Sequence, residues 1–259
     1  YHGVAPWMQD KNRPGVIASD SAHVIKIKWN DLEELENLLG QGDNDIACFI
    51  SSPYDHPVSR DNSLPNEGYW EKVTSLCKAH GILTIVDDVR SGFRINLKGS
   101  NVAFGFSPDM ICFGKAIANG HPLASLVGKE EIKTAAERVY FTGTQFFSAP
   151  PMAAAIATLN ELEKVDAPTK LIDYGKKLNA RLEAVASEKG FNLVSSGVPS
   201  MPYYRLEGQS FETHIKWIDE CVKRGVYMLS YHNHFISLAH KEEDIDFIES
   251  AARQAFESL

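Results

Sequence analysis

The sequence predicts an α/β fold with a mostly parallel sheet, helices on both faces, and a smaller α+β domain at the C-terminal end. Short, nearly continuous apolar runs alternate with amphipathic stretches through the first half, which is typical of buried parallel strands joined by helices. Near Ser148 this alternation gives way to helices and short strands in a less regular order. We therefore expect a large domain over residues 1–165 and a small one over 166–259.

The first half contains four predicted strands and two clear helices. A helix over 30–40 has Asn30 or Asp31 as its N-cap and Gly40 as its stop, and a helix over 67–81 ends at a glycine. The strands are HVIKIKW (23–29), IACFIS (46–51), ILTIVDD (82–88) and DMICFG (109–114). Ligand sites in such sheets lie at the carboxyl ends of the strands, so the loops after Ile50, Val86 and Phe113 should carry the chemistry.

The second half predicts four helices and four short strands. The first helix enters through Pro150 and Pro151, as prolines favour the first turn. The helices are expected over 148–165, 169–190, 210–225 and 241–259, and the strands over 191–196, 201–207, 226–230 and 234–239.

Composition excludes several classes of protein. The 259 residues carry a formal charge of −8, with no dense basic cluster, which argues against a nucleic-acid partner. No apolar run is long enough to span a membrane, and no signal peptide is visible. The four cysteines are scattered and have no metal-ligand spacing, as in reduced proteins of the cytoplasm. We therefore expect a cytoplasmic protein.

Asp87 and Lys115 are the residues on which a chemical hypothesis depends. Asp87 follows ILTIV and Lys115 follows MICFG, 28 residues later, so both are expected just past buried strands. An aspartate there can keep a pyridine nitrogen protonated, and a lysine in a dry pocket loses its proton and condenses with aldehydes. Pyridoxal 5′-phosphate (PLP) requires these two groups.

Each of these residues also has a structural alternative. Asp87 or Asp88 could cap a helix or pair with Arg90 or Arg94, and Lys115 could extend along the surface to water. The two aspartates alternate faces on a strand, and no histidine is near them in the sequence, so we expect no metal site.

Five segments together give the chain a family resemblance. They are YHG (1–3), IVDDVRSGFR (85–94), PDMICFGKAIANGHPLASLVG (108–128), TGTQFFSAPPMAAA (142–155) and HFISLAHKEEDID (234–246). In this order and spacing the chain resembles class III aminotransferases, PLP-dependent enzymes of fold type I that include the glutamate-1-semialdehyde aminomutase branch. The resemblance covers essentially the whole chain.

The resemblance implies a role for each matching residue. Lys115 would form the Schiff base with the cofactor aldehyde, and Asp87 would pair with the pyridinium nitrogen. Val89 would pack on one face of the ring and Tyr1 on the other. Thr144 would donate to the cofactor phosphate of a neighbouring subunit, which implies a homodimer with shared active sites. Tyr1 as an ordinary aromatic and Thr144 as a turn residue are the alternatives.

The chain departs from the family pattern at several positions. Ser52 stands where the family commonly has glutamate, and Arg90 where it has glutamine. Arg90 could contact the cofactor's phenolic oxygen or a substrate carboxylate, or form a surface ion pair. His232 replaces an acidic residue of the aminomutase branch, and His232 and His234 either face the substrate or serve the loop.

The family's phosphate-binding turn precedes the YHG segment and is not in this chain. We therefore expect the chain to lack the N-terminal part of a longer protein, so whether this chain alone binds PLP stays open.

The resemblance implies an aminotransferase that moves an amino group between an amine or amino acid and a keto acid by a ping-pong Schiff-base mechanism. One alternative is a glutamate-1-semialdehyde-type 2,1-aminomutase, which needs no external keto acid. Another is a non-catalytic protein that uses the same fold to bind PLP or to act as a scaffold.

Overall fold

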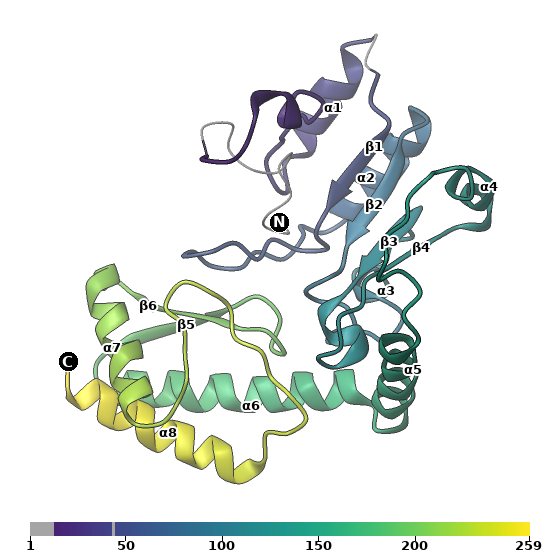
Figure 1. Cartoon of the computed structure of the whole chain (residues 1–259). Coiled ribbons are helices and arrows are strands. Elements are labelled where there is room, and N and C mark those ends of the chain that lie inside the picture. Colours follow the sequence, from purple (N-terminus) through teal and green to yellow (C-terminus); the bar gives the residue numbers. More distant parts are fainter. Residues whose placement is uncertain (1–12, 43–44) are drawn as a thin grey trace. The chain divides into compact units, whose positions relative to one another are not determined.

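The computed structural model describes residues 13–42 and 45–259, which divide into two compact units (Figure 1). The first unit comprises the described part of Tyr1–Pro53 together with Pro65–Gly92 and Lys98–Thr158. The second comprises Tyr54–Leu64, Phe93–Leu97 and Leu159–Leu259. Each unit has its own arrangement of helices and strands.

The first unit is built on a four-stranded mixed sheet. Its strands, in spatial order, are β1 (Cys48–Ser51), β2 (Leu83–Asp87), β3 (Met110–Phe113) and β4 (Ser125–Gly128). The first three run parallel, and β4 pairs antiparallel with β3. The three parallel strands confirm the sequence prediction, whereas the antiparallel strand was not predicted.

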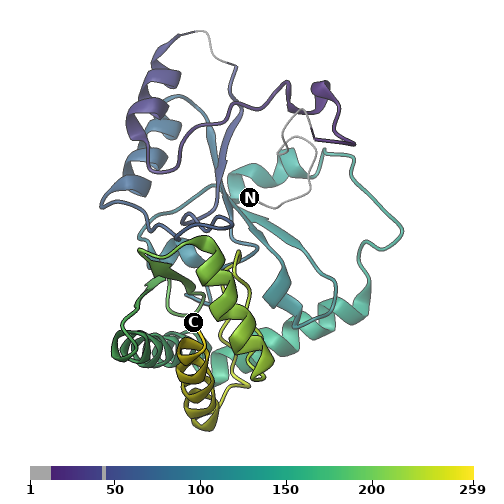
Figure 2. The ribbon, with the colours of Figure 1, turned by 90° about the vertical axis from the view of Figure 1, so that its left-hand side faces the viewer.

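Helices α1 (Leu32–Gly40) and α2 (Tyr69–Ala79) pack on one side of this sheet (Figure 2). Asp31 caps α1 by accepting the Glu34 N–H at 2.9 Å, as predicted. The shared core contains Leu35 and Leu39 of α1, Trp70 and Val73 of α2, and Val86 of β2, among others. This packing fixes the position of β2, whose carboxyl end carries Asp87.

The remaining elements of the first unit are short, apart from α5. They are η2 (Ala18–Ser21), α3 (Ser100–Ala103), η3 (Lys115–Ala118), η4 (Glu130–Ile132) and α4 (Lys133–Ala136). Helix α5 (Ala149–Lys164) includes both prolines in its first turn and crosses the boundary between the two units.

The second unit packs three helices with a two-stranded antiparallel sheet. The helices are α6 (Ala167–Glu188), α7 (Phe211–Lys223) and α8 (Glu242–Glu257), and the strands are β5 (Asn192–Ser196) and β6 (Tyr203–Glu207). Leu182, Trp217 and Phe256 lie in their common core. A Cβ on Gly175 would lie 1.9 Å from the Pro199 carbonyl oxygen, so α6 can approach this loop only with glycine there.

Three predicted strands, over 23–29, 226–230 and 234–239, are wrong. The described structure places them in extended or turn conformations whose amides bond outside a regular ladder. The Lys28 N–H donates to the Glu34 carboxylate at 2.8 Å, and the Leu229 N–H donates to Nε2 of His234 at 3.2 Å. Because side chains accept these amides, no continuous strand pairing forms.

Across residues 13–42 and 45–259, the helices are all too short or too polar to cross a membrane.

Candidate active site at the carboxyl edge of the sheet

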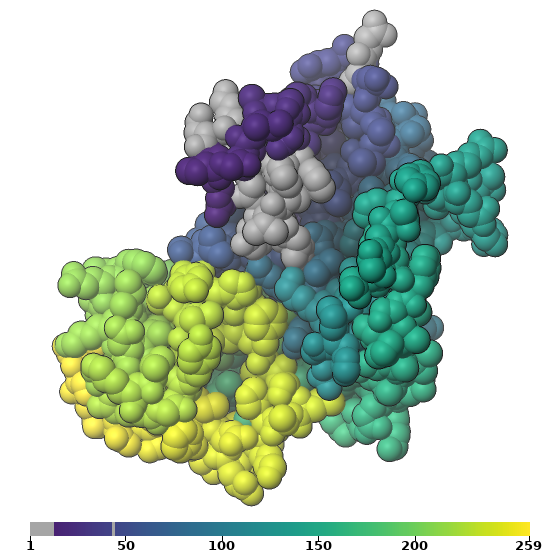
Figure 3. Space-filling view, in the orientation of Figure 1, coloured from purple at the N-terminus to yellow at the C-terminus, as the bar shows by residue number. Residues whose placement is uncertain are grey.

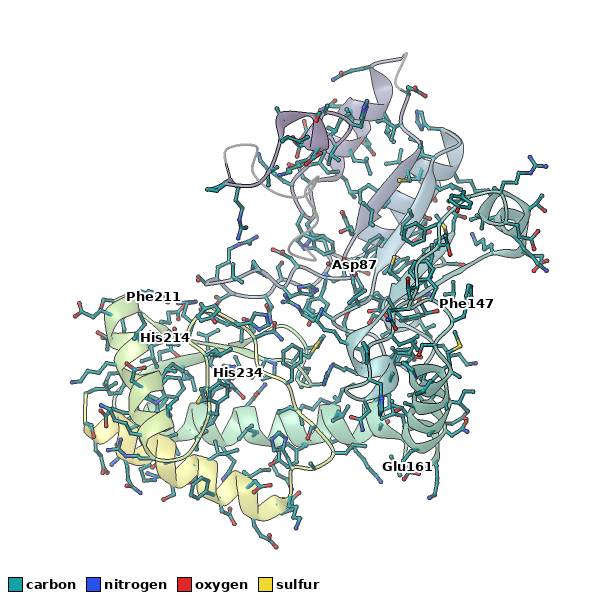
Figure 4. All side chains as sticks on the ribbon, viewed as in Figure 1. Asp87, Phe147, Glu161, Phe211, His214 and His234 are labelled. Atoms are coloured by element: carbon teal, nitrogen blue, oxygen red, sulfur yellow. The ribbon has the colours of Figure 1, made fainter. Side chains whose placement is uncertain are left out.

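The carboxyl ends of β1, β2 and β3 bring three predicted site residues to one edge of the sheet. Ser51 of β1 pairs with Val86 of β2, and Asp87 pairs with Cys112 of β3. Ser52 therefore follows β1 beside the position of Asp87, and Lys115 follows β3 by two residues. Figure 4 shows Asp87 at the end of its strand.

Adjacent aspartates at the end of β2 have different surroundings. Asp88 is 1% exposed and accepts hydrogen bonds from Ser91 Oγ (2.6 Å), Ser100 N (2.8 Å) and Ser100 Oγ (2.6 Å). Its burial raises the pKa of the carboxyl, an effect that these hydrogen bonds oppose. Asp87 is half-buried and accepts the Val89 N–H at 3.2 Å. Asp88 is thus held by Ser91 and Ser100, while Asp87 lies half-buried at the carboxyl end of β2.

The turn after Asp88 is closely packed against β3. The Gly92 N–H donates to the Asp88 carbonyl at 2.8 Å, and a Cβ at Gly92 would lie 2.9 Å from the Phe113 ring. Arg90 lies within this turn and is only 3% exposed. This burial does not fit the surface location of the ion pair that is one of its three predicted roles, and the contacts with cofactor or substrate stay predictions.

Lys115 begins the short helix η3 in a left-handed conformation, with φ of +44°. That conformation costs a non-glycine residue about 1 kcal/mol or more and often marks a functional position. A Cβ on the preceding Gly114 would lie 3.0 Å from Val89 Cγ1, a contact so tight that the Val89 side chain would have to shift. The chain thus places Val89 directly beside the backbone that carries Lys115.

The side chain of Lys115 is exposed. The dry pocket expected around it is therefore not formed by residues 13–42 and 45–259. Its position at the edge of the sheet agrees with the prediction, whereas its burial does not.

Ser52 is 7% exposed, and its hydroxyl is buried without a hydrogen-bond partner among the described residues. A buried hydroxyl without a partner costs roughly 1–3 kcal/mol. The arrangement therefore leaves a polar atom beside the carboxyl edge that a ligand could satisfy.

Thr144 lies at the surface of the first unit in a turn between β4 and α5. The stretch around it is unusually apolar for an exposed loop. Tyr140 is 92% exposed and Phe147 85%, and Figure 4 shows Phe147 projecting outward. Figure 3 shows that the chain between α4 and α5 lies at the molecular surface.

His232 and His234 belong to the second unit, where both line a largely apolar cavity of about 420 Å³. Burial lowers the pKa of His234 to about 4, and the nearby His232 and His214 act in the same direction. The His234 Nε2 accepts the Leu229 N–H, so its position in the loop is structural. Tyr1, the predicted ring-stacking residue, lies outside the described residues.

Sequence reasoning missed the features that depend on tertiary contact. Ser91 and Ser100 hold Asp88, but only their position near a strand end could have suggested this role. The left-handed conformation of Lys115 had no signal in the sequence beyond the glycine before it. Among the described residues, no group of three or more metal-binding side chains occurs.

Comparison with known proteins connects this geometry to a family. The family model described as aminotransferase class-III matches residues 10–244. An aminopentol aminotransferase of Sphingopyxis macrogoltabida is 36% identical over 260 residues, covering all of this chain and 61% of its own length. A glutamate-1-semialdehyde 2,1-aminomutase of Geotalea daltonii is 30% identical, covering 95% of this chain and 61% of its own length.

A solved structure of the FumI protein of Sphingopyxis sp. MTA144, in its PLP internal aldimine form, superposes with a TM-score of 0.95 at 36% identity. The match covers 100% of this chain and 62% of that one. An omega-transaminase from Sphaerobacter thermophilus shares the fold, with a TM-score of 0.82 at 19% identity over 95% of this chain and 60% of its own.

The chain thus spans about three-fifths of the length of the relatives that it matches. The agreement nevertheless extends through both units of the chain, from the strands that carry Asp87 and Lys115 to the C-terminal helices. This chain belongs to the class III aminotransferases, a family of PLP-dependent enzymes of fold type I.

Proposed function

We propose that the protein containing this chain is a PLP-dependent aminotransferase that exchanges an amino group between an amine or amino acid and a keto acid. The observation that carries the proposal is the pairing of β2 with β3, which brings Asp87 and the backbone before Lys115 to the same edge of the sheet. Names of two relatives, an aminopentol aminotransferase and a 3-aminobutyryl-CoA aminotransferase, support an amino-group transfer.

The residues at this edge fit PLP in three respects. The unpartnered Ser52 hydroxyl offers a hydrogen bond. Val89, against Gly114, offers an apolar surface for a planar ring. Lys115 is exposed at the open edge and held by a left-handed backbone. We infer that Ser52, Asp87, Val89, Arg90 and Lys115 hold the cofactor here, together with Tyr1 and with Thr144 of a second copy.

Each side chain then has a definite task. The bound cofactor supplies an electron sink for the carbon that loses its proton. The Asp87 carboxylate keeps a proton on the pyridine nitrogen, because a fixed negative charge favours the protonated ring. Lys115 would hold the cofactor through its Nζ, and its free amine would hold and move the proton at the substrate carbon. A ping-pong cycle follows if a keto acid takes up the amino group.

The wider organisation belongs to the same proposal. We infer a large PLP-binding domain over residues 1–165, a small domain over 166–259, a homodimer with shared sites, and a cytoplasmic location. The exposed aromatic side chains around Thr144 support the homodimer, since a second copy would cover them.

Replacing Lys115 with alanine tests the function. In the natural full-length protein we expect Lys115→Ala to abolish the absorbance band of the lysine-bound cofactor and to lower amino-transfer activity at least about a thousandfold, because the substitution removes the amine that this proposal assigns to both tasks. Lys133→Ala is the matched control, since Lys133 is an exposed lysine on α4. An unchanged band in Lys115→Ala would disprove the assignment.

The activity assay, run with and without an added keto acid, distinguishes an aminotransferase from an aminomutase. An aminomutase would convert a semialdehyde substrate without an added keto acid, whereas the aminotransferase requires pyruvate or 2-oxoglutarate as acceptor. Cofactor binding without turnover of any amine would instead indicate a non-catalytic protein.

A further inference from the structure

Arg94 is a half-buried arginine of the second unit that the proposed chemistry does not use. Its Nη1 donates to the carbonyl of Ile236 at 3.2 Å. Its Cζ lies 4.8 Å from the centre of the Phe235 ring, within the range of a cation–π contact. Two chain segments more than 140 residues apart thus position one guanidinium.

No carboxylate pairs with this guanidinium within the described part of the chain. Burial lowers the pKa of Arg94, which shows that its surroundings disfavour the charge. Its Nε is buried without a hydrogen-bond partner, and its Nη2 makes no hydrogen bond to a described residue. Other arginines of this unit, such as Arg205 with Asp61, have an acidic partner. A cation so placed would be stabilised by an anion from outside the chain.

The surroundings also give a ligand access and a surface to lie on. Phe235 is 37% exposed, so part of the side chain on which Arg94 stacks reaches solvent. The ring of His232 lies 5.9 Å from that of Phe235, and its Nδ1 is within 2.8 Å of the Asn233 carbonyl. Since a carbonyl only accepts, Nδ1 carries the proton there. The His232 Nε2 makes no hydrogen bond to a described residue, which leaves a second polar atom beside the same ring.

We propose that Arg94 binds a carboxylate group of a small-molecule ligand, with Phe235 as the surface on which the guanidinium is held. A guanidinium fixed by stacking and by one carbonyl presents its remaining N–H groups in a plane, which matches the two oxygens of a carboxylate. Inorganic phosphate also fits a guanidinium fork, so it serves as the competing anion in the test.

Amino acids and keto acids both carry a carboxylate, so the assignment names the group by which a substrate would be selected. In that respect the inference rests on the proposed aminotransferase function. Whether Arg94 binds a carboxylate does not depend on the aminotransferase function, and this binding is measured separately from activity.

Succinate is the probe, because it carries carboxylates but no amino or keto group and so cannot react. In the natural full-length holoprotein we expect succinate to bind saturably in a calorimetric titration and to protect Arg94 from modification by phenylglyoxal, with the modified residue located by mass spectrometry. This protection is measured on the protein without any substitution, so the result does not depend on whether a variant folds.

Variants then identify the side chain. Arg94→Lys should weaken succinate binding about tenfold or more, because an ammonium group cannot bind two oxygens in one plane. Arg60→Lys is the control, since Arg60 is an exposed arginine of the same unit already paired with Asp55 at 2.9 Å. Lys115→Ala should leave succinate binding intact even if it abolishes turnover.

Two results would overturn the inference. Modification of Arg94 at the same rate with and without succinate, together with equal binding by Arg94→Lys, would mean that Arg94 only fastens its segment to Ile236. Stronger protection by inorganic phosphate than by succinate would exclude a carboxylate site.

Discussion

Asp87 and Asp88 show how one step along the chain gives two aspartates different surroundings. Successive strand residues point to opposite faces, so only one of the two can enter the interior behind β2. Asp88 does so and satisfies its carboxylate with Ser91 and Ser100. Asp87 stays at the open edge, where the sequence placed the chemistry. The alternation of strand residues predicted that the two aspartates would differ. The serine partners of Asp88 could not be predicted, because Ser100 meets it only in the folded chain.

Replacing Asp88 should therefore destabilise the fold more than replacing Asp87. Asp88→Ala leaves the Ser91 hydroxyl and both donors of Ser100 buried without their acceptor. We expect a loss of about 2–4 kcal/mol in the free energy of unfolding, measured in urea.

Asp87→Asn is the comparison for this experiment. An asparagine can still accept the Val89 N–H, so we expect a loss below about 1 kcal/mol together with a large loss of amino-transfer activity. Equal destabilisation by the two substitutions would contradict the division of roles.

At the scale of elements, the sequence predicted those whose signals are local. Helix α1 has an N-cap, and β2 and β3 are compact apolar runs that need only their neighbours in the sheet. The strands predicted over 226–230 and 234–239 failed because their amides and carbonyls bond to side chains and isolated carbonyls. The Ser230 carbonyl accepts from Tyr203 Oη at 3.1 Å and from His214 Nε2 at 3.2 Å. These two donors come from β6 and α7, whose packing against this segment no local pattern encodes.

This segment should make the second unit sensitive to acid. The Leu229 N–H donates to a neutral His234, and protonation of Nε2 would remove that acceptor. The pKa of His234 is lowered from 6.5 to about 4 by burial, so the unfolded chain binds the proton more readily than the folded one. The contribution of His234 to the free energy of unfolding is therefore fully present above about pH 6.5 and is lost as the pH falls through about 4. The pKa of the buried His214 is lowered in the same direction.

The measurement is the free energy of unfolding in urea between pH 7 and pH 4. We expect His234 to account for up to about 3 kcal/mol of the decrease, since each unit of pKa shift corresponds to about 1.4 kcal/mol. His234→Gln keeps an acceptor for the Leu229 N–H without a titrating group and should flatten the pH dependence. His121→Gln, at an exposed histidine, is the control and should leave it unchanged. An equally steep decrease in His234→Gln would contradict the assignment.

At the scale of the whole molecule, strand order and chain direction predicted which edge of the sheet carries Asp87 and Lys115. The predicted enclosure of Lys115 is not formed by the described residues, among which its side chain is exposed. Enclosure depends on surfaces brought together from distant segments or from a second copy. The family resemblance implies such a surface through Thr144 of a second copy, and the neighbours of Thr144 are aromatic side chains exposed to solvent.

These aromatic side chains should form part of an interface between two copies. Phe141 and Phe146 lie 5.1 Å apart, and Phe146 meets Phe147 edge-on at 6.5 Å, so they form one aromatic cluster rather than isolated exposed rings.

In a two-fold dimer each copy contributes the same patch, so Phe147→Glu changes the interface twice. Losing the burial of one phenylalanine costs about 2 kcal/mol. Losing two costs about 4 kcal/mol, which corresponds to a roughly thousandfold weaker dimer.

Sedimentation of the natural full-length protein over a range of concentrations measures this. We expect the Phe147→Glu protein to dissociate at concentrations where the protein without the substitution stays dimeric. Activity should fall in parallel, because dissociation withdraws Thr144 from the partner's cofactor. Tyr227→Glu is the matched control, since Tyr227 is 80% exposed in the second unit and lies outside this cluster. A Phe147→Glu protein that remains dimeric at the same dilution as the unmodified one would show that the cluster is not at the interface.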